Sequence, residues 1–203
     1  MKETAIRYLV LASSQKRVQG LSEMLHGQIE TSADFLVVSS NLWDLWHWGT
    51  SNVSLLAEKK IADHELAAWG PHLSSLLNEV EANVPKEVVL IFRTGAAGSW
   101  GACPDTDGSI PLPHVGVHKQ HMYQLNAVAK AALRQHPRWH LLDVEPLLGE
   151  FDCPQHYLRD YIHMTPWVNW NILNLYINML TNHWHDHGLP SWRRTRHHRA
   201  HLH

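Results

Sequence analysis

Short apolar runs alternate with longer stretches in which apolar residues recur every three or four positions, and this alternation constrains the fold most. Four of the runs have the length and the residue types of buried β-strands, namely residues 6–12, 35–40, 88–92 and 140–144. Strands that alternate with helices typically form a parallel sheet whose crossover helices cover its faces. The sequence therefore predicts an α/β fold.

The stretches between these runs are predicted helices, at residues 16–27, 54–84 and 117–135. We expect the second to break at Gly70-Pro71, because proline lacks the N–H that a helix interior needs. After a loop over residues 145–158, a last helix is predicted over residues 166–182, with Thr165 as its N-cap and Pro166 in its first turn. These elements predict one domain, residues 1–182, followed by a tail rich in His and Arg, residues 183–203.

Length and charge exclude several classes of protein. A chain of 203 residues with 44% hydrophobic content can bury one substantial core. The net charge is −2 and the basic residues gather only near the end of the chain, so we expect no nucleic-acid partner. No apolar stretch approaches the roughly 20 residues of a membrane span, and no signal peptide is visible. We predict neither a cofactor nor a metal site in the domain, and these features leave the localisation open.

Asp160 and His163 stand just ahead of the last predicted helix. There a carboxylate can accept a hydrogen bond from the imidazole and fix its tautomer, which leaves the other ring nitrogen as a general base. The spacing alone is weak evidence, since a second Asp-x-x-His occurs at Asp44 and His47. The structural alternative is a histidine that stabilises the helix start, with Asp160 paired to Arg159.

Residues 141–145, 157–163 and 169–171 together resemble the closing block of the PC-esterase group of GDSL/SGNH-like acyl-esterases. In that family Asp-x-x-His supplies the acid and the base of a Ser-His-Asp triad. The resemblance implies that Asp160 is the acid and His163 the base. It also implies a three-layer, SGNH-hydrolase-like fold and makes the secretory pathway a possible location.

Two further blocks resemble the same family in the same order. Residues 35–44 are similar to a strand that ends in Asn-Ser-Gly-Leu-Trp-Asp, with Asn41 in place of the glycine whose N–H faces the oxyanion. Asparagine tolerates the left-handed backbone that such a position can require. Residues 89–95 resemble the family strand that ends in Arg-Thr, which implies a substrate-facing donor role for Arg93 and Thr94. For Arg93 a structural ion pair is the alternative.

The block that would carry the nucleophile is not recognisable. Ser13 and Ser14 follow an apolar run but lack the preceding Gly-Asp and an elbow glycine. We therefore expect the fold to be incomplete at its N-terminus, with the nucleophile strand upstream of Met1. A triad enzyme without its nucleophile loses nearly all triad-dependent rate, so the chain by itself is expected to be weak or inactive.

The predicted function is that of an acyl-esterase or acyltransferase acting on O-acyl esters, with a small-molecule or carbohydrate ester, such as an O-acetyl carbohydrate, as its partner. The alternative is a non-catalytic binding or interaction module that keeps the fold. A cysteine hydrolase with Cys153 as its nucleophile is another hypothesis. In an oxidising compartment, a disulfide bond between Cys153 and Cys103 is the more natural expectation.

A further hypothesis is that His183, His185 and His187, with Asp186 between them, bind a metal ion. Alternate residues do not share a helical face, so only an extended segment would present all three imidazoles together. A solvated tail with adventitious metal affinity is the simpler interpretation.

Overall fold

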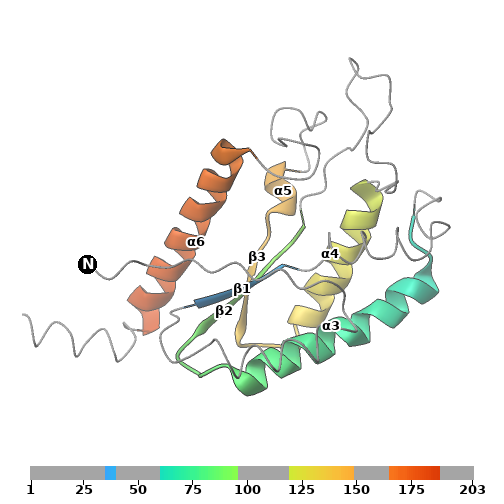
Figure 1. The fold of residues 1–203 in the computed structure, drawn as a ribbon, viewed down its shortest axis with the longest axis horizontal. Helices are drawn as coiled ribbons and strands as arrows, with labels where there is room; N and C mark the ends of the chain where they lie inside the picture. Colours follow the sequence, from blue (N-terminus) through green and yellow to red (C-terminus); the bar gives the residue numbers. More distant parts are fainter. Residues whose placement is uncertain (1–34, 40–59, 96–118, 149–164, 188–203) are drawn as a thin grey trace, which may run out of the picture.

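Three of the apolar runs pair side by side as parallel strands. The computed structural model describes residues 35–39, 60–95, 119–148 and 165–187. Along the chain the elements are β1 (Phe35–Val38), α3 (Asp63–Asn83), β2 (Val89–Arg93), α4 (Lys119–Leu133), β3 (Trp139–Leu142), α5 (Glu145–Leu148) and α6 (Pro166–His187) (Figure 1). The described strands form one sheet in the order β1-β2-β3, which confirms the prediction of an α/β chain with a parallel sheet.

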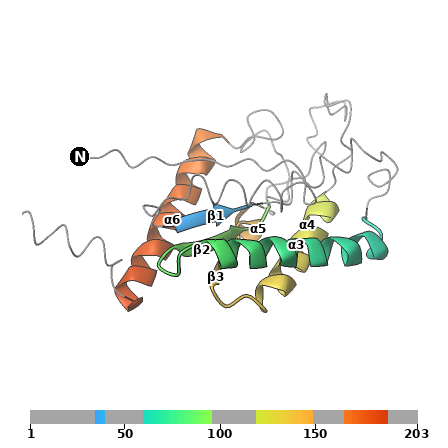
Figure 2. The same cartoon turned by 60° about the horizontal axis from the view of Figure 1, so that its bottom comes forward.

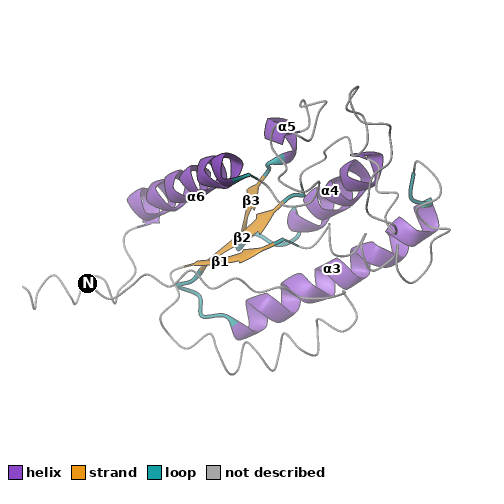
Figure 3. Cartoon of the chain, turned by 45° about the horizontal axis from the view of Figure 1, so that its top comes forward, coloured by secondary structure: helices purple, strands orange, loops and turns teal. Residues whose placement is uncertain are grey.

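Strand β2 lies between its two neighbours and has helices on both sides. Its residues Leu90 and Phe92 pack into one apolar cluster with α3 and α4, whereas Val89 and Ile91 pack into a second cluster with α6. Figures 1 and 3 show α6 on one side of the strands and α3 and α4 on the other. All four side chains are buried, which is why β2 reads as a continuous apolar run and not as an alternating one.

Helix α3 runs through the predicted break. It continues from Asp63 to Asn83 with Pro71 in its interior, so the prediction of a break at Gly70-Pro71 was wrong. Proline in a helix interior costs about 3 kcal/mol. The helix buries Trp69, Leu73, Leu76, Leu77 and Val80. Each such burial contributes roughly 1.5–3 kcal/mol, so packing outweighs the cost of the proline. Figure 2 shows the unbroken helix running alongside the strands.

Helix α6 runs in the opposite direction to β3. The ring of His140, near the start of β3, lies 5.0 Å from the ring of His183, near the end of α6. The beginning of α6, with Val168 and Ile172, shares an apolar cluster with Leu142 and Val144 at the end of β3. The first residues of α6 therefore lie at the edge of the sheet where the strands end.

The boundaries of several predicted elements change. Pro166 is the first residue of α6, as predicted, but the helix continues to His187, five residues beyond the predicted end. Thr165 precedes it and its carbonyl oxygen accepts the N–H of Asn169, yet its hydroxyl has no hydrogen-bond partner among the described residues. The capping bond predicted for that hydroxyl is therefore not seen. The predicted loop over residues 145–158 begins with the helical turn of α5.

The predicted strand over residues 6–12 and the predicted helix over residues 16–27 lie outside the described residues. Among the helices that the structure describes, none combines the length and the apolarity needed to cross a membrane.

Candidate functional site

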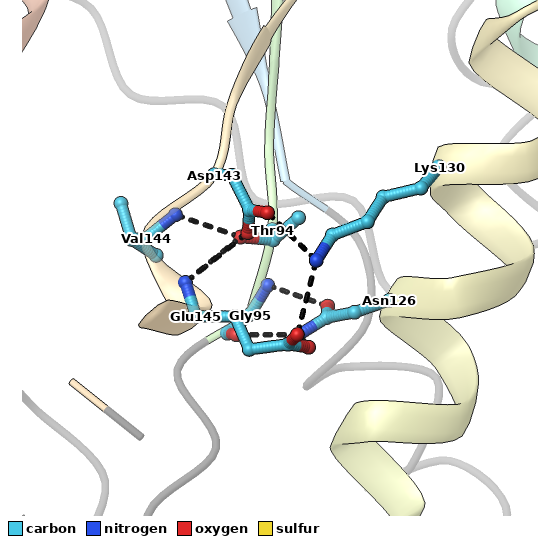
Figure 4. Close-up of polar contacts among 7 residues, drawn as sticks. All are labelled: Thr94, Gly95, Asn126, Lys130, Asp143, Val144 and Glu145. Atoms are coloured by element: carbon cyan, nitrogen blue, oxygen red, sulfur yellow. Dashed lines mark hydrogen bonds and ion pairs between the residues drawn. The ribbon is translucent and has the colours of Figure 1, made fainter. Parts of the chain in front are cut away.

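Thr94 and Asp143 follow the neighbouring strands β2 and β3 and meet at the carboxyl edge of the sheet, where α/β proteins usually bind ligands. The Thr94 hydroxyl donates a hydrogen bond to Oδ1 of Asp143 at 2.9 Å and accepts one from the N–H of Val144 at 2.9 Å. Figure 4 shows Thr94 enclosed by these partners. Because a hydroxyl has one proton, Thr94 can donate to a substrate only if it releases Asp143.

Asn126 reaches the same edge from α4. Its side-chain amide accepts the N–H of Gly95 at 2.9 Å and donates to the carbonyl oxygen of Gly95 at 2.8 Å. The amide nitrogen also donates to Oε2 of Glu145 at 2.6 Å. A Cβ atom at position 95 would overlap the sulfur of Met122, so a larger residue there would require the Met122 side chain to move.

Lys130, one helical turn after Asn126, joins two carboxylates. Its Nζ lies 2.7 Å from Oδ2 of Asp143 and 3.0 Å from Oε1 of Glu145. Burial disfavours the ammonium, but the hydrogen bonds to Asp143 and Glu145 and the attraction of both charges outweigh it, so the pKa of Lys130 is raised. The lysine stays charged at neutral pH and ties the connection between β3 and α5 to α4.

We call Thr94, Gly95, Asn126, Lys130, Asp143, Val144 and Glu145 the edge network (Figure 4). Its side chains bond to one another and to the backbone, and each carboxylate has a cation and a further donor. Because these groups are already engaged with one another, we assign the network a positioning role. It fixes where β2 and β3 end and where α5 begins.

The side chain of Arg93, the last residue of β2, lies on the face of the sheet that α6 covers. Side chains alternate along a strand, so Arg93 lies on the same face as Val89 and Ile91, which pack against α6. One of its terminal nitrogens lies 3.4 Å from Oγ of Ser39, after β1, and its buried Nε has no partner among the described residues. Within these residues no carboxylate pairs with Arg93, and its buried Nε is a donor left for a ligand.

The predicted site residues are only partly placed. The structure brings Arg93 and Thr94 to the carboxyl edge, but on opposite faces of the sheet. The other predicted residues, Asn41, Asp160 and His163, lie outside the described residues, as do Ser13, Ser14, Cys103 and Cys153. Four residues of the edge network were not predicted as site residues, namely Asn126, Lys130, Asp143 and Glu145. Asp143 and Glu145 belong to the block of residues 141–145, which could have drawn attention to them. The four-residue spacing of Asn126 and Lys130 places both on one face of a helix and could have indicated that they act together.

The comparisons with known proteins add no family. No family model matches this chain. Neither curated proteins nor solved structures gave a match. The function therefore has to be argued from the geometry and from the motifs.

Three imidazoles gather at the opposite edge of the sheet, and we call His140, His183 and His187 the histidine cluster. The ring centre of His183 lies 5.0 Å from that of His140 and 4.7 Å from that of His187. Burial, and then the proximity of His187, lowers the pKa of His140. Burial, and then the proximity of His140 and His187, lowers the pKa of His183, which Asp186 partly opposes.

The histidine cluster contains His140 in place of His185, which belonged to the predicted set of metal ligands. His185 is 87% exposed and bonds to Asp186, so it faces solvent and not His183 and His187. The segment is helical, and the extended arrangement considered for residues 183–187 was wrong. As the side chains stand, no three or more His, Cys, Asp or Glu residues in the described part of the chain form a ready metal site.

Proposed function

We propose that this chain is the Asp/His-bearing part of an acyl-esterase or acyltransferase of the SGNH type, with a three-layer α/β fold, that acts on O-acyl esters. An O-acetyl carbohydrate is one candidate substrate. In this mechanism a serine attacks the ester carbonyl, His163 accepts the serine proton, and Asp160 orients the imidazole. Donors at the carboxyl edge, including Arg93 and the backbone at Asn41, stabilise the oxyanion.

The observation that carries this proposal is the direction of α6. Because α6 runs antiparallel to β3, its first residues lie at the carboxyl edge, on the face that Arg93 shares. His163 precedes Thr165 by two residues, and a chain spans at most about 3.6 Å per residue. The covalent chain therefore limits the Cα atom of His163 to within about 7 Å of that of Thr165, which directly precedes the helix packed on the face that Arg93 shares.

The edge network supports the same proposal indirectly. A catalytic edge needs strand ends that do not shift when a substrate binds, since small displacements of catalytic groups cost much of the rate. The network supplies this rigidity through bonds between β2, β3, α4 and α5. In this mechanism Thr94 is a positioning residue, because its hydroxyl proton is directed at Asp143.

The second candidate is a non-catalytic binding module with the same fold. It is favoured by the lack of a Gly-Asp-Ser block and by the engagement of the Thr94 hydroxyl within the edge network. Under this alternative, Arg93 would bind an anionic or carbonyl-bearing ligand without chemistry.

Ester hydrolysis by the intact chain separates the two candidates. We expect weak hydrolysis of p-nitrophenyl acetate above the buffer rate, because His163 can act as a general base on water even without a serine nucleophile. The variant His163→Ala should lose this activity, whereas the matched variant His156→Ala should keep it. Equal rates for His163→Ala and the parent chain would contradict the assigned base. A parent chain that does not turn over the ester above the buffer rate would favour the binding module.

A further inference from the structure

We propose that His140, His183 and His187 form a site for a divalent transition-metal ion, with Zn²⁺ as the reference ion, that ties the end of α6 to the start of β3. This site is independent of the acyl-esterase proposal, because it lies at the opposite edge of the sheet. Its role is structural.

The spacing of the rings carries the proposal. With Zn–N distances of about 2.0–2.1 Å and tetrahedral angles, the ring centres of two ligating imidazoles lie about 5 Å apart. The ring centres here are 5.0 Å apart for His140 and His183, and 4.7 Å apart for His183 and His187. His183 and His187 are one helical turn apart, a spacing that lets two side chains of a helix share one ligand.

The surroundings of the histidine cluster suit a cation. The rings border a hollow of about 390 Å³, which is lined by His140, Met179, Asn182, His183, Asp186 and His187. Nδ1 of His183 is buried and has no hydrogen-bond partner among the described residues, a costly state for a polar atom. Asp186 adds one negative charge to the lining and can bind the ion or a water molecule on it.

Charge separates a metal from an anion as the ligand. An anion would need protonated imidazoles, but crowded and partly buried rings resist protonation, and the pKa values of His140 and His183 are accordingly lowered. A neutral imidazole offers a lone pair, which is what Zn²⁺ binds.

The rings have to turn before they can ligate one ion. They do not form a ready set of ligands as placed, and the rings of His140 and His183 meet at 83°. His187 is exposed on the last turn of α6, so changing its rotamer disturbs little packing. Binding should therefore order the last turn of α6 against β3.

Zn²⁺ titration of the intact chain by calorimetry tests this site. To remove binding by the tail, the parent chain carries asparagine at His197, His198, His201 and His203. We expect saturable binding of one Zn²⁺ per chain, accompanied by a rise in Tm. His187→Ala and His140→Asn should each weaken binding by roughly 10-fold or more, because even the partners of metal ligands cost about 10–100-fold when removed. His185→Ala, next to the site in sequence but facing solvent, should bind as the parent does.

Three results would overturn the proposal. The first is that the tail-substituted chain shows no saturable Zn²⁺ binding. The second is that His185→Ala and His187→Ala weaken Zn²⁺ binding equally. The third is that His140→Asn keeps full affinity, which would mean that α6 alone chelates the ion. Circular dichroism without metal establishes that each variant is folded. If His140→Asn fails to fold, His140→Gln replaces it and the same affinity comparison decides.

Discussion

Asn126 bonds to both the N–H and the carbonyl oxygen of Gly95, at 2.9 Å and 2.8 Å, and so takes the place of a neighbouring strand where β2 ends. Both partners are buried. Without Asn126, two backbone polar groups would be left in the interior with no replacement from water. One side chain of α4 therefore satisfies the backbone of Gly95, just beyond the end of β2.

We expect Asn126→Ala to destabilise the fold by roughly 2 kcal/mol or more, since each buried group left unsatisfied costs about 1–3 kcal/mol. Chemical denaturation gives the free energy of unfolding. Gln124→Ala is the matched control, because Gln124 makes the same pair of bonds to Ile61, at 2.8 Å and 2.9 Å, in a partly exposed setting. The control should lose less stability, and an equal loss would show that burial is not the cause.

Thr94 provides a second prediction. Thr94→Val keeps the shape but removes the hydroxyl that accepts from Val144 and donates to Asp143, so we expect a loss of about 1–3 kcal/mol in the free energy of unfolding. Thr94→Ser keeps the hydroxyl and should lose clearly less. Should both variants be equally unstable, the packing of the methyl group and not the hydrogen bonds would explain the position.

Pro71 provides a third prediction. Pro71→Ala restores a helical N–H in the interior of α3 and removes a steric clash, so Tm should rise, with a gain of about 1–3 kcal/mol in the free energy of unfolding. Pro166→Ala is the comparison, since proline is well tolerated in the first turn of α6. Thermal denaturation should show little change for that variant. A drop in Tm for Pro71→Ala would mean that the proline stabilises the chain through the unfolded state.

The histidine cluster predicts how stability depends on pH in metal-free solution. The pKa values of His140 and His183 are lowered in the folded state. At pH values well above about 6.5 both rings are neutral in the folded and in the unfolded chain, so there they do not change the free energy of unfolding. As pH falls below about 6.5, the unfolded chain binds protons first and stability declines, until the folded-state pKa values are passed. His187 opposes protonation of both rings, and Asp186 favours it for His183.

His140→Gln should reduce this acid-induced loss of stability, because one of the two shifted groups is removed and the repulsion on His183 is relieved. The measurement is the free energy of unfolding at pH 7 and at pH 5, with a chelator present. His185→Gln, on the solvent side of α6, serves as the control. An unchanged slope in His140→Gln would contradict the assigned origin.

The central strand of the sheet was predictable because both of its faces are covered, so its sequence is a continuous apolar run. Residues 88–92 became β2 with a shift of one position. Pro71 misled the prediction, since local backbone cost was weighed without the packing of Trp69, Leu73 and Leu77. The edge network was missed because Asn126 and Gly95 are 31 residues apart, and no local pattern reports such a contact. Periodicity likewise could not reveal that His140 meets His183.

Helix α6 spans the sheet from one edge to the other, with the histidine cluster near its last residue and Thr165 just before its first. Thr165 and His183 are 18 residues apart, which is about 27 Å along a helix axis. A tilt of about 5° around the histidine contact would displace the far end by about 2 Å, by simple leverage over that length. A small adjustment of imidazoles at one edge thus becomes a displacement large enough to matter for hydrogen-bond geometry at the other.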